Sequence, residues 1–212
     1  METIVYTAII NSKDILQQMP KEKGVRYICF SDKQFHHPLW EWHPVEKLGQ
    51  ADPRRIARRY KILSYIYFPG CRTIWIDGRI NLNKKPSEMF STYKSDFAVR
   101  PHHSRACIYQ EGLQVKKLNY DDLRVVELQM MYLKEQGYPE MNGLHETGCL
   151  LRRPTKKVET FNSLWWGLLS TGSKRDQLSF DYVSWRLNHT IEEMNRGDVT
   201  VTRHARITNK NT

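Results

Sequence analysis

The sequence predicts one α/β domain in which a mostly parallel sheet lies between layers of helices. Short β-branched and apolar runs alternate along the chain with segments of helical periodicity, which is the pattern of a parallel sheet. The apolar run 73–76 ends abruptly at Asp77 and Gly78, as expected for a buried strand whose carboxyl end meets a ligand. The chain has 212 residues, 40% of them hydrophobic, and no low-complexity linker, so we expect one domain with a single hydrophobic core.

The chain is expected to start with a β-α-β unit and a capped helix. Asp52 is a good N-cap residue, and Pro53 is favoured at the first helical position. Apolar residues recur at helical spacing as far as Tyr67, and Pro69 with Gly70 ends this helix. The elements expected before it are a strand at 3–10, a short helix at 11–19, a strand at 25–30, and an irregular loop at 34–50 with at most one strand.

The remaining elements are predicted from apolar periodicity and capping residues. A helix that begins at Asp121 or Asp122 and stops at Gly137 has the clearest signals, because Asp caps helix N-termini and Gly ends helices. The other expected elements are a helix at 86–93, a strand at 96–100, a strand at 146–151, helices near 159–169 and 175–188, and a strand at 199–202.

The composition favours anionic ligands and a reducing environment. Lys and Arg number 33 against 23 Asp and Glu, and the resulting charge of +10 is spread along the chain, so phosphates are natural ligands. The alternative is a basic surface that is merely solvated. The four cysteines form no Cys-x-x-Cys pair, which is typical of free thiols in the cytosol. With no signal-peptide pattern and no apolar stretch of about 18 residues, we expect a cytoplasmic protein without a transmembrane segment.

The helix after Asp52 carries an unusual concentration of cations near its N-terminus, where the helix dipole disfavours them. A bound anion would compensate for this placement, and Lys61 is expected to lie close to the strand that ends at Asp77. The alternatives are a solvated basic face and a surface that contacts nucleic acid. The basic residues are Arg54, Arg55, Arg58, Arg59 and Lys61.

Asp77 and Gly78 have two interpretations. A carboxylate at a strand end, followed by a glycine that lets a ligand approach the backbone, suits a divalent cation held between the protein and a diphosphate. The same dipeptide is common in turns. The wholly apolar strand before Asp77 and the basic helix before that strand favour a diphosphate site.

A resemblance to a known family rests on six short motifs in a fixed order, at 5–8, 28–32, 59–63, 75–78, 105–111 and 173–180. Trp-x-Asp-Gly is the fourth motif, and Ser-x-Arg-Asp-Gln-x-Ser-Phe is the last. Together they resemble the GT-A-like glycosyltransferases long catalogued as a domain of unknown function, which include plant wall-polysaccharide enzymes and bacterial and phage proteins. The resemblance implies a Rossmann-like α/β/α sandwich with a nucleotide-binding part at about 1–100, an acceptor-side part at about 101–190, and a C-terminal strand and tail.

The resemblance also implies where a nucleotide-sugar donor, expected to be a UDP-sugar, would bind. Asp77 takes the place of the metal-binding Asp-x-Asp motif of GT-A enzymes, so Mn²⁺ or Mg²⁺ is expected there. Arg79 stands where the second Asp usually is, and a guanidinium at that position would itself neutralise a diphosphate, which leaves metal dependence open. The expected donor-binding residues are Tyr6, Thr7, Asp32, Arg58, Arg59, Lys61, Asp77, Gly78 and Arg79.

The later motifs would form the acceptor side. Glu146 or Asp176 would serve as the base of an inverting reaction, whereas Asp176 with Gln177 at a helix start resembles retaining enzymes, so the stereochemistry stays open. Asp176 has the rival role of a helix cap, and Glu146 the rival role of an ion-pair partner of Arg152 or Arg153. The expected catalytic residues are Glu146, Arg175, Asp176 and Gln177.

Other candidates for this side are His102 and Arg105, which would touch the substrate. Of Trp165 and Trp166, one is expected in the core, and the other would stack on a sugar or a base. His204 follows the last strand, where some GT-A enzymes have a metal-binding histidine.

The function expected from these residues is transfer of a sugar to a hydroxyl acceptor. The acceptor would be a glycan or a hydroxymethylated base of phage DNA, and the basic charge suits an anionic acceptor. The compartment would be the cytoplasm of a bacterial or phage-infected cell. The alternative is a basic nucleic-acid-binding protein without catalysis.

Overall fold

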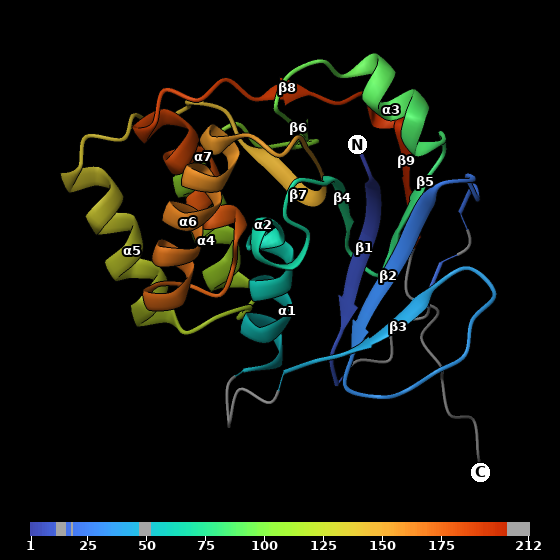
Figure 1. Ribbon diagram of the computed structural model, residues 1–212. Helices are drawn as coiled ribbons and strands as arrows, with labels where there is room; N and C mark the ends of the chain where they lie inside the picture. Colours follow the sequence, from blue (N-terminus) through green and yellow to red (C-terminus); the bar gives the residue numbers. More distant parts are fainter. Residues whose placement is uncertain (12–15, 18, 47–51, 203–212) are drawn as a thin grey trace, which may run out of the picture.

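The computed structural model describes residues 1–11, 16, 17, 19–46 and 52–202. Its centre is a seven-stranded sheet with the strand order β3-β2-β1-β4-β7-β6-β8 (Figure 1). Only β7 runs against the other strands of this sheet, because it pairs antiparallel with both β4 and β6. The strands are β1 (Thr3–Ile9), β2 (Val25–Ser31), β3 (Glu41–Pro44), β4 (Arg72–Ile76), β6 (Phe97–Pro101), β7 (His145–Arg152) and β8 (Glu192–Glu193).

Helices cover one face of the sheet, and a mixed layer covers the other. Figure 1 shows α1, α2 and α4 to α7 on one side, and each face has its own apolar core cluster. The mixed layer contains α3 and an antiparallel pair of short strands, β5 (Ile80–Leu82) and β9 (Val199–Val201). The helices are α1 (Pro53–Ile62), α2 (Ser64–Tyr67), α3 (Pro86–Thr92), α4 (Ile108–Lys117), α5 (Leu123–Glu135), α6 (Lys156–Thr171) and α7 (Gln177–Arg186), with a 3₁₀ turn η1 (Arg196–Asp198).

The predicted helix after Asp52 is divided into two. Asp52 caps α1 as expected, since its side chain accepts hydrogen bonds from the N–H groups of Arg54 and Arg55. The helix breaks at Leu63, where the dihedral angles are φ −85° and ψ 40°. In a continuous helix the carbonyl groups of Lys61 and Ile62 would accept hydrogen bonds from the next turn. Instead, the Lys61 carbonyl accepts from the Tyr6 hydroxyl (2.8 Å) and the Ile62 carbonyl accepts from the Arg152 guanidinium (3.3 Å). Tertiary partners thus end the helix, which local periodicity could not reveal.

The other elements follow the sequence with local differences. Asp122 caps α5, and Gly137 ends it with a φ of 78°, as predicted. The structure adds α4, which the sequence analysis did not predict. Most of the helix expected at 11–19 lies outside the described residues, and the described positions 16, 17 and 19 are not helical. None of the described helices has the length and apolarity needed to cross a membrane.

The reversed direction of β7 determines what lies at the carboxyl edge of the sheet. The start of β7 reaches the edge at which β1, β2 and β4 end, and the Asp77 N–H donates to the Gly148 carbonyl (2.8 Å). Asp77 also opens a turn, because the Ile80 N–H donates to its carbonyl (2.8 Å). The turn interpretation of the Asp-Gly pair is therefore confirmed for the backbone, while the Asp77 side chain lies at the carboxyl edge of the sheet.

Candidate active site

Four segments bring five polar side chains together at the carboxyl edge. Helix α1 supplies two cations, the residue after β4 supplies a carboxylate, β7 supplies a hydroxyl, and the residue before α7 supplies a second carboxylate. We call this group the edge cluster: Arg58, Lys61, Asp77, Thr147 and Asp176.

Lys61 lies at the centre of the edge cluster and has no exposed surface. Its Nζ is 2.5 Å from Asp176 Oδ2, 3.4 Å from Asp77 Oδ1 and 3.3 Å from the Thr147 hydroxyl. Burial lowers the pKa of Lys61 from its usual range, and the charges of the two carboxylates oppose that effect. The amine therefore joins two carboxylates that would otherwise repel each other.

Asp176 is only 3% exposed and has partners for both of its oxygens. Oδ1 lies 3.0 Å from Arg58 Nε, and Oδ2 accepts a hydrogen bond from the Thr147 hydroxyl (2.9 Å). Although burial acts in the opposite direction, the charges of Arg58 and Lys61 hold the pKa of Asp176 well below its usual range. Asp176 occupies the N-cap position of α7, but its side chain makes no capping hydrogen bond there. The carboxylate thus serves the edge cluster.

Asp77 is the accessible carboxylate of the edge cluster, with 34% of its side chain exposed. Its Oδ1 accepts a hydrogen bond from Trp75 Nε1 (2.8 Å) and lies 3.5 Å from Arg58 Nη1. Its Oδ2 faces Gly148, where an added Cβ would lie 3.6 Å away, and has no hydrogen-bond partner among the described residues. This oxygen is therefore free to accept a hydrogen bond from a ligand.

The other cations of α1 bind within the protein. Arg55 donates to the carbonyls of Leu169 and Gly172 (2.7 Å to Gly172) at the end of α6, where the helix dipole favours a cation. Arg54 donates to the Tyr120 carbonyl (3.1 Å). These contacts supply the compensation that a bound anion was expected to provide, although Arg54 stays exposed at the surface.

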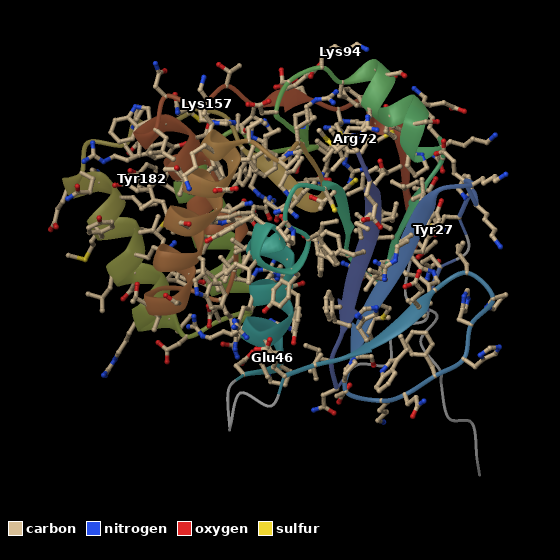
Figure 2. All side chains as sticks on the ribbon, viewed as in Figure 1. Tyr27, Glu46, Arg72, Lys94, Lys157 and Tyr182 are labelled. Atoms are coloured by element: carbon tan, nitrogen blue, oxygen red, sulfur yellow. The ribbon has the colours of Figure 1, made fainter. Side chains whose placement is uncertain are left out.

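Arg59 also points away from the edge cluster. Its Nη1 lies 2.5 Å from Glu46, which Figure 2 labels beside the first turn of α1. Its guanidinium carbon lies 5.9 Å from the centre of the Tyr67 ring. An exposed carboxylate and an aromatic ring therefore hold the Arg59 side chain away from the edge cluster, and its expected contact with a diphosphate stays a prediction.

The segment before Asp176 is held by polar residues that the sequence analysis did not select. Asp121 accepts hydrogen bonds from the Ser173 hydroxyl (2.6 Å) and the Lys174 N–H (2.8 Å). Gln129 accepts from the Ser173 N–H (2.7 Å) and donates to the Leu178 carbonyl (2.8 Å). The sequence did contain one sign of this role: Gln129 is a polar residue on the otherwise apolar face of α5 that Val126 and Leu133 define.

Glu146 lies at the same edge but pairs with residues other than Arg152 and Arg153. Its carboxylate accepts from Arg100 and lies 2.7 Å from His103 Nδ1. Although burial acts in the opposite direction, the His103 hydrogen bond and the Arg100 charge lower the pKa of Glu146. Glu146 is therefore an ionised residue that is already engaged.

Several expected ligand-binding side chains have no exposed surface. Tyr6 is fully buried under α1, and its hydroxyl is shared between the Lys61 carbonyl and Arg152. Trp165 is also fully buried and donates to the Asp176 carbonyl (2.9 Å). Both pack behind the edge cluster and have no surface open to a ligand. The expected contacts of Tyr6 with the donor and of Trp165 with the acceptor are therefore wrong. The prediction that one of the two tryptophans packs in the core is met by Trp165, while Trp166 is partly buried against the same core.

The remaining donor-side candidates are placed as follows. Thr7 is 1% exposed, and its hydroxyl has no partner among the described residues. Asp32, just after β2, accepts from the Asn11 N–H (3.1 and 3.2 Å to its two oxygens), so it links the carboxyl ends of β1 and β2. Gly78 follows Asp77 in the turn, and Arg79 is exposed.

The acceptor-side candidates flank the cluster. Arg175 packs over the Tyr120 ring (5.2 Å), and Gln177 Nε2 is buried without a partner in the described part of the chain. Arg105 binds Glu111 (2.7 Å) and lies 3.1 Å from His102 Nε2. Burial, with the Arg105 charge, lowers the pKa of His102 to about 4. His204 lies outside the described residues.

The described residues do not fit a divalent metal ion at Asp77. Cations lie beside Asp77 Oδ1 and both oxygens of Asp176, so Asp77 Oδ2 would be the single carboxylate oxygen left for the ion. In the part of the chain that the structure describes, the ligand atoms of His102, His103 and Glu146 lie within 4.8 Å of one another. Arg100 already neutralises this carboxylate, and Arg105 lies against His102, so the group does not favour a cation.

Comparisons with known proteins identify the family of the chain. The TOD1/MUCI70, glycosyltransferase-like domain family matches residues 29–207. The probable hexosyltransferase MUCI70 of Arabidopsis thaliana is 25% identical over 170 residues, which are 72% of this chain and 29% of that protein. The chain thus spans less than a third of this relative's length.

Solved structures show the fold. The apo structure of the bifunctional glycosyltransferase WbbM has a TM-score of 0.50 and 11% identity, with 91% of this chain and 38% of that chain covered. Mouse xyloside xylosyltransferase 1 has a TM-score of 0.48 and 10% identity, with 92% and 84% covered. The predicted α/β fold of the GT-A type, with a mostly parallel central sheet, is confirmed. By the family match, the chain belongs to the TOD1/MUCI70 family of glycosyltransferase-like domains.

Proposed function

We propose that this protein transfers a glycosyl group from a nucleotide-sugar to a hydroxyl acceptor, and that the edge cluster binds the sugar and diphosphate of the donor. The observation that carries the proposal is the convergence of two cations and two carboxylates at the carboxyl edge of a GT-A-type sheet. The hexosyltransferase name of the Arabidopsis relative supports a hexose as the transferred sugar. The donor that we propose is a UDP-hexose.

The chemistry of the edge cluster suits the breaking of a sugar–phosphate bond. The anomeric carbon gains positive charge in the transition state while negative charge grows on the leaving diphosphate. The accessible carboxylate of Asp77 would stabilise the positive sugar and accept hydrogen bonds from its hydroxyl groups, while the buried Asp176 would hold Arg58 and Lys61 in place. Arg58, with 18% of its side chain exposed, and the exposed Arg79 would balance the diphosphate. In this proposal these side chains neutralise the leaving group, and no step depends on a metal ion.

Neither candidate base is well suited to remove the acceptor proton. A general base works best when its pKa lies near the working pH, whereas the pKa values of Asp176 and Glu146 are both lowered by ion pairs. We therefore propose that a phosphate oxygen of the donor accepts this proton on the face of the departing diphosphate. The acceptor then attacks from the same face, and the anomeric configuration is retained.

The acceptor stays open between a hydroxyl of an acidic or neutral glycan and a hydroxymethylated base in DNA. The net charge of +10 supports an anionic acceptor in either case. We also propose a cytoplasmic location, for which the four free cysteines are the support. The rival function, nucleic-acid binding without catalysis, has less support from α1, because Arg55, Arg58 and Arg59 are each paired with groups of the protein.

A donor screen tests the proposal. The purified protein would be incubated with UDP- and GDP-sugars, and nucleotide release would be measured with water, oligosaccharides or hydroxymethylated DNA as acceptor. We expect thermal stabilisation by UDP and release from one UDP-hexose, with the anomeric configuration of the product read by NMR. Stabilisation by duplex DNA alone, without turnover of any donor, would reject the proposal in favour of the rival. An inverted product would reject the proton transfer to the donor phosphate.

A further inference from the structure

Helix α5 has an exposed stripe directly opposite its buried face. The buried side contains Val126 and Leu133. On the other side Leu128 is 65% exposed and Met131 is 58% exposed. At about 100° per residue, positions 124, 128, 131 and 135 fall within a sector of roughly 60°. The stripe thus has an apolar centre and a charged residue at each end: Arg124, Leu128, Met131 and Glu135, all exposed.

Figure 1 shows α5 at the outer margin of the helical layer, with other helices between it and the sheet. Single exposed leucines are ordinary, but this stripe has further apolar neighbours. Tyr132 is 42% exposed, and its ring centre lies 6.2 Å from that of Tyr182, which Figure 2 labels beside α5. Tyr182 in turn contacts Trp185 (5.8 Å), which is 38% exposed. Aromatic residues and Met are enriched in protein–protein interfaces.

The charges at the two ends of the stripe are unfavourable in an isolated helix. Arg124 lies in the first turn of α5, where the helix dipole disfavours a cation, and Glu135 lies in the last turn, where it disfavours an anion. Neither side chain forms an ion pair with another described residue. A second helix that runs in the opposite direction would reverse both effects.

We propose that α5 pairs with α5 of a second copy of this chain in an antiparallel arrangement around a two-fold axis. With the axis midway between Gln129 and Met130, Leu128 of one copy faces Met131 of the other. The same axis brings Arg124 opposite Glu135 of the second copy, about 8 Å along the helix from the centre. Each charge then lies beside an opposite charge and beside the favourable end of the other helix.

This match identifies the occupant of the stripe as a second copy. A two-fold interface must be complementary to itself, so every contact must occur twice about one centre. Here one centre satisfies the apolar pair and the charged pair together, whereas docking of a different protein would not require any relation between the two ends of α5. The dimer would leave the edge cluster unchanged, since Gln129 on the inner face of α5 keeps its contacts with Ser173 and Leu178.

Sedimentation velocity over micromolar protein concentrations tests the interface. We expect the wild-type protein to be a dimer and the double variant Leu128→Glu/Met131→Glu to be a monomer with an unchanged circular dichroism spectrum. The matched control is Ile66→Glu, since Ile66 is 53% exposed on α2 and outside the stripe, and this variant should remain a dimer. A monomeric wild-type protein, or a dimer that persists in the double variant, would overturn the proposal.

Charge reversal tests the register. Arg124→Glu and Glu135→Arg should each weaken dimerisation roughly tenfold, because the axis repeats each like-charge contact twice. The combined variant should recover most of the lost affinity, since the opposite charges face each other again, but not all of it, because each reversed charge now lies beside the unfavourable end of the other helix. Both reversals suit the dipole of the single helix, so weaker association would not reflect loss of α5. Failure of the combined variant to recover would overturn the antiparallel register.

Discussion

The Nζ atom of Lys61 lies 2.5 Å from Asp176 Oδ2, and neither side chain has appreciable contact with solvent. Helix α1 and the start of α7 are therefore joined by a buried ion pair under the proposed donor site. Taking two charges out of water has a large free-energy cost, and the pair, the Thr147 hydroxyl and Arg58 offset it together. This relationship gives predictions for stability as well as for catalysis.

Removing one partner of this buried pair should destabilise the fold strongly. Lys61→Met or Asp176→Asn should each lower the free energy of unfolding by about 3 kcal/mol, because each leaves a buried charge with one fewer partner. The double variant should lose at least about 1 kcal/mol less than the sum of the single losses. Urea denaturation measures these values. The pair Arg59 and Glu46, also 2.5 Å apart but more exposed, is the control and should show coupling below about 1 kcal/mol. Equal coupling in the two pairs would contradict the role of burial.

The contribution of Asp176 should depend on pH in one direction. Because its folded-state pKa is depressed, the stabilisation is fully present above its unfolded pKa of about 3.9 and is lost as the pH falls toward the folded-state value. The difference in unfolding free energy between wild type and Asp176→Asn should therefore be constant near neutrality and shrink in acid. Urea midpoints from pH 7 to about pH 3 give this difference. A difference that grows in acid would contradict the depressed pKa.

Asp77→Asn should remove activity while leaving the fold intact. We expect the turnover number to fall by at least about a hundredfold, because the accessible carboxylate of the edge cluster would no longer stabilise the developing positive charge. The change in melting temperature should be small, since this side chain is 34% exposed. Nucleotide release and thermal unfolding measure the two effects. Glu46→Gln, which alters a carboxylate outside the edge cluster, should keep full activity; an equal loss there would indicate a general structural effect.

Binding of UDP should not require a divalent metal. Cations of the protein lie beside three of the four carboxylate oxygens of the edge cluster, so they occupy the place that a divalent ion would take there. Calorimetric titration with UDP should give dissociation constants within about threefold of each other in EDTA and in Mn²⁺, a difference below 1 kcal/mol. Binding that appears only with Mn²⁺ would contradict this prediction and restore Asp77 as a metal ligand.

The local parts of the fold could be read from the sequence. The strand before Asp77, the cap at Asp52 and the stop at Gly137 depend on residues a few positions apart, and each lies where it was predicted. The resemblance in the motif order also selected Lys61, Asp77 and Asp176, which the structure brings together. Periodicity and capping are local properties, so they needed no knowledge of which strands are neighbours.

Other features of the site depend on contacts between segments that are far apart in the sequence. Local spacing could not show that Arg55 would bind the carbonyl groups at the end of α6. It also could not show that the Tyr6 hydroxyl would donate a hydrogen bond to the Lys61 carbonyl in α1. Thr147 reaches the edge cluster because β7 is antiparallel to the strands beside it, and the pairing of strands in the sheet determines that direction.

The sequence by itself determined most strands of the main sheet, most of the long helices and the carboxylate at the end of β4, because backbone preference and apolar pattern act over short distances. The tertiary structure alone decided which cations remain near that carboxylate and which are bound elsewhere. Ionic contacts between distant segments depend on the packing that buries them. An exposed charge stays hydrated, whereas a buried charge needs an ion-pair or hydrogen-bond partner.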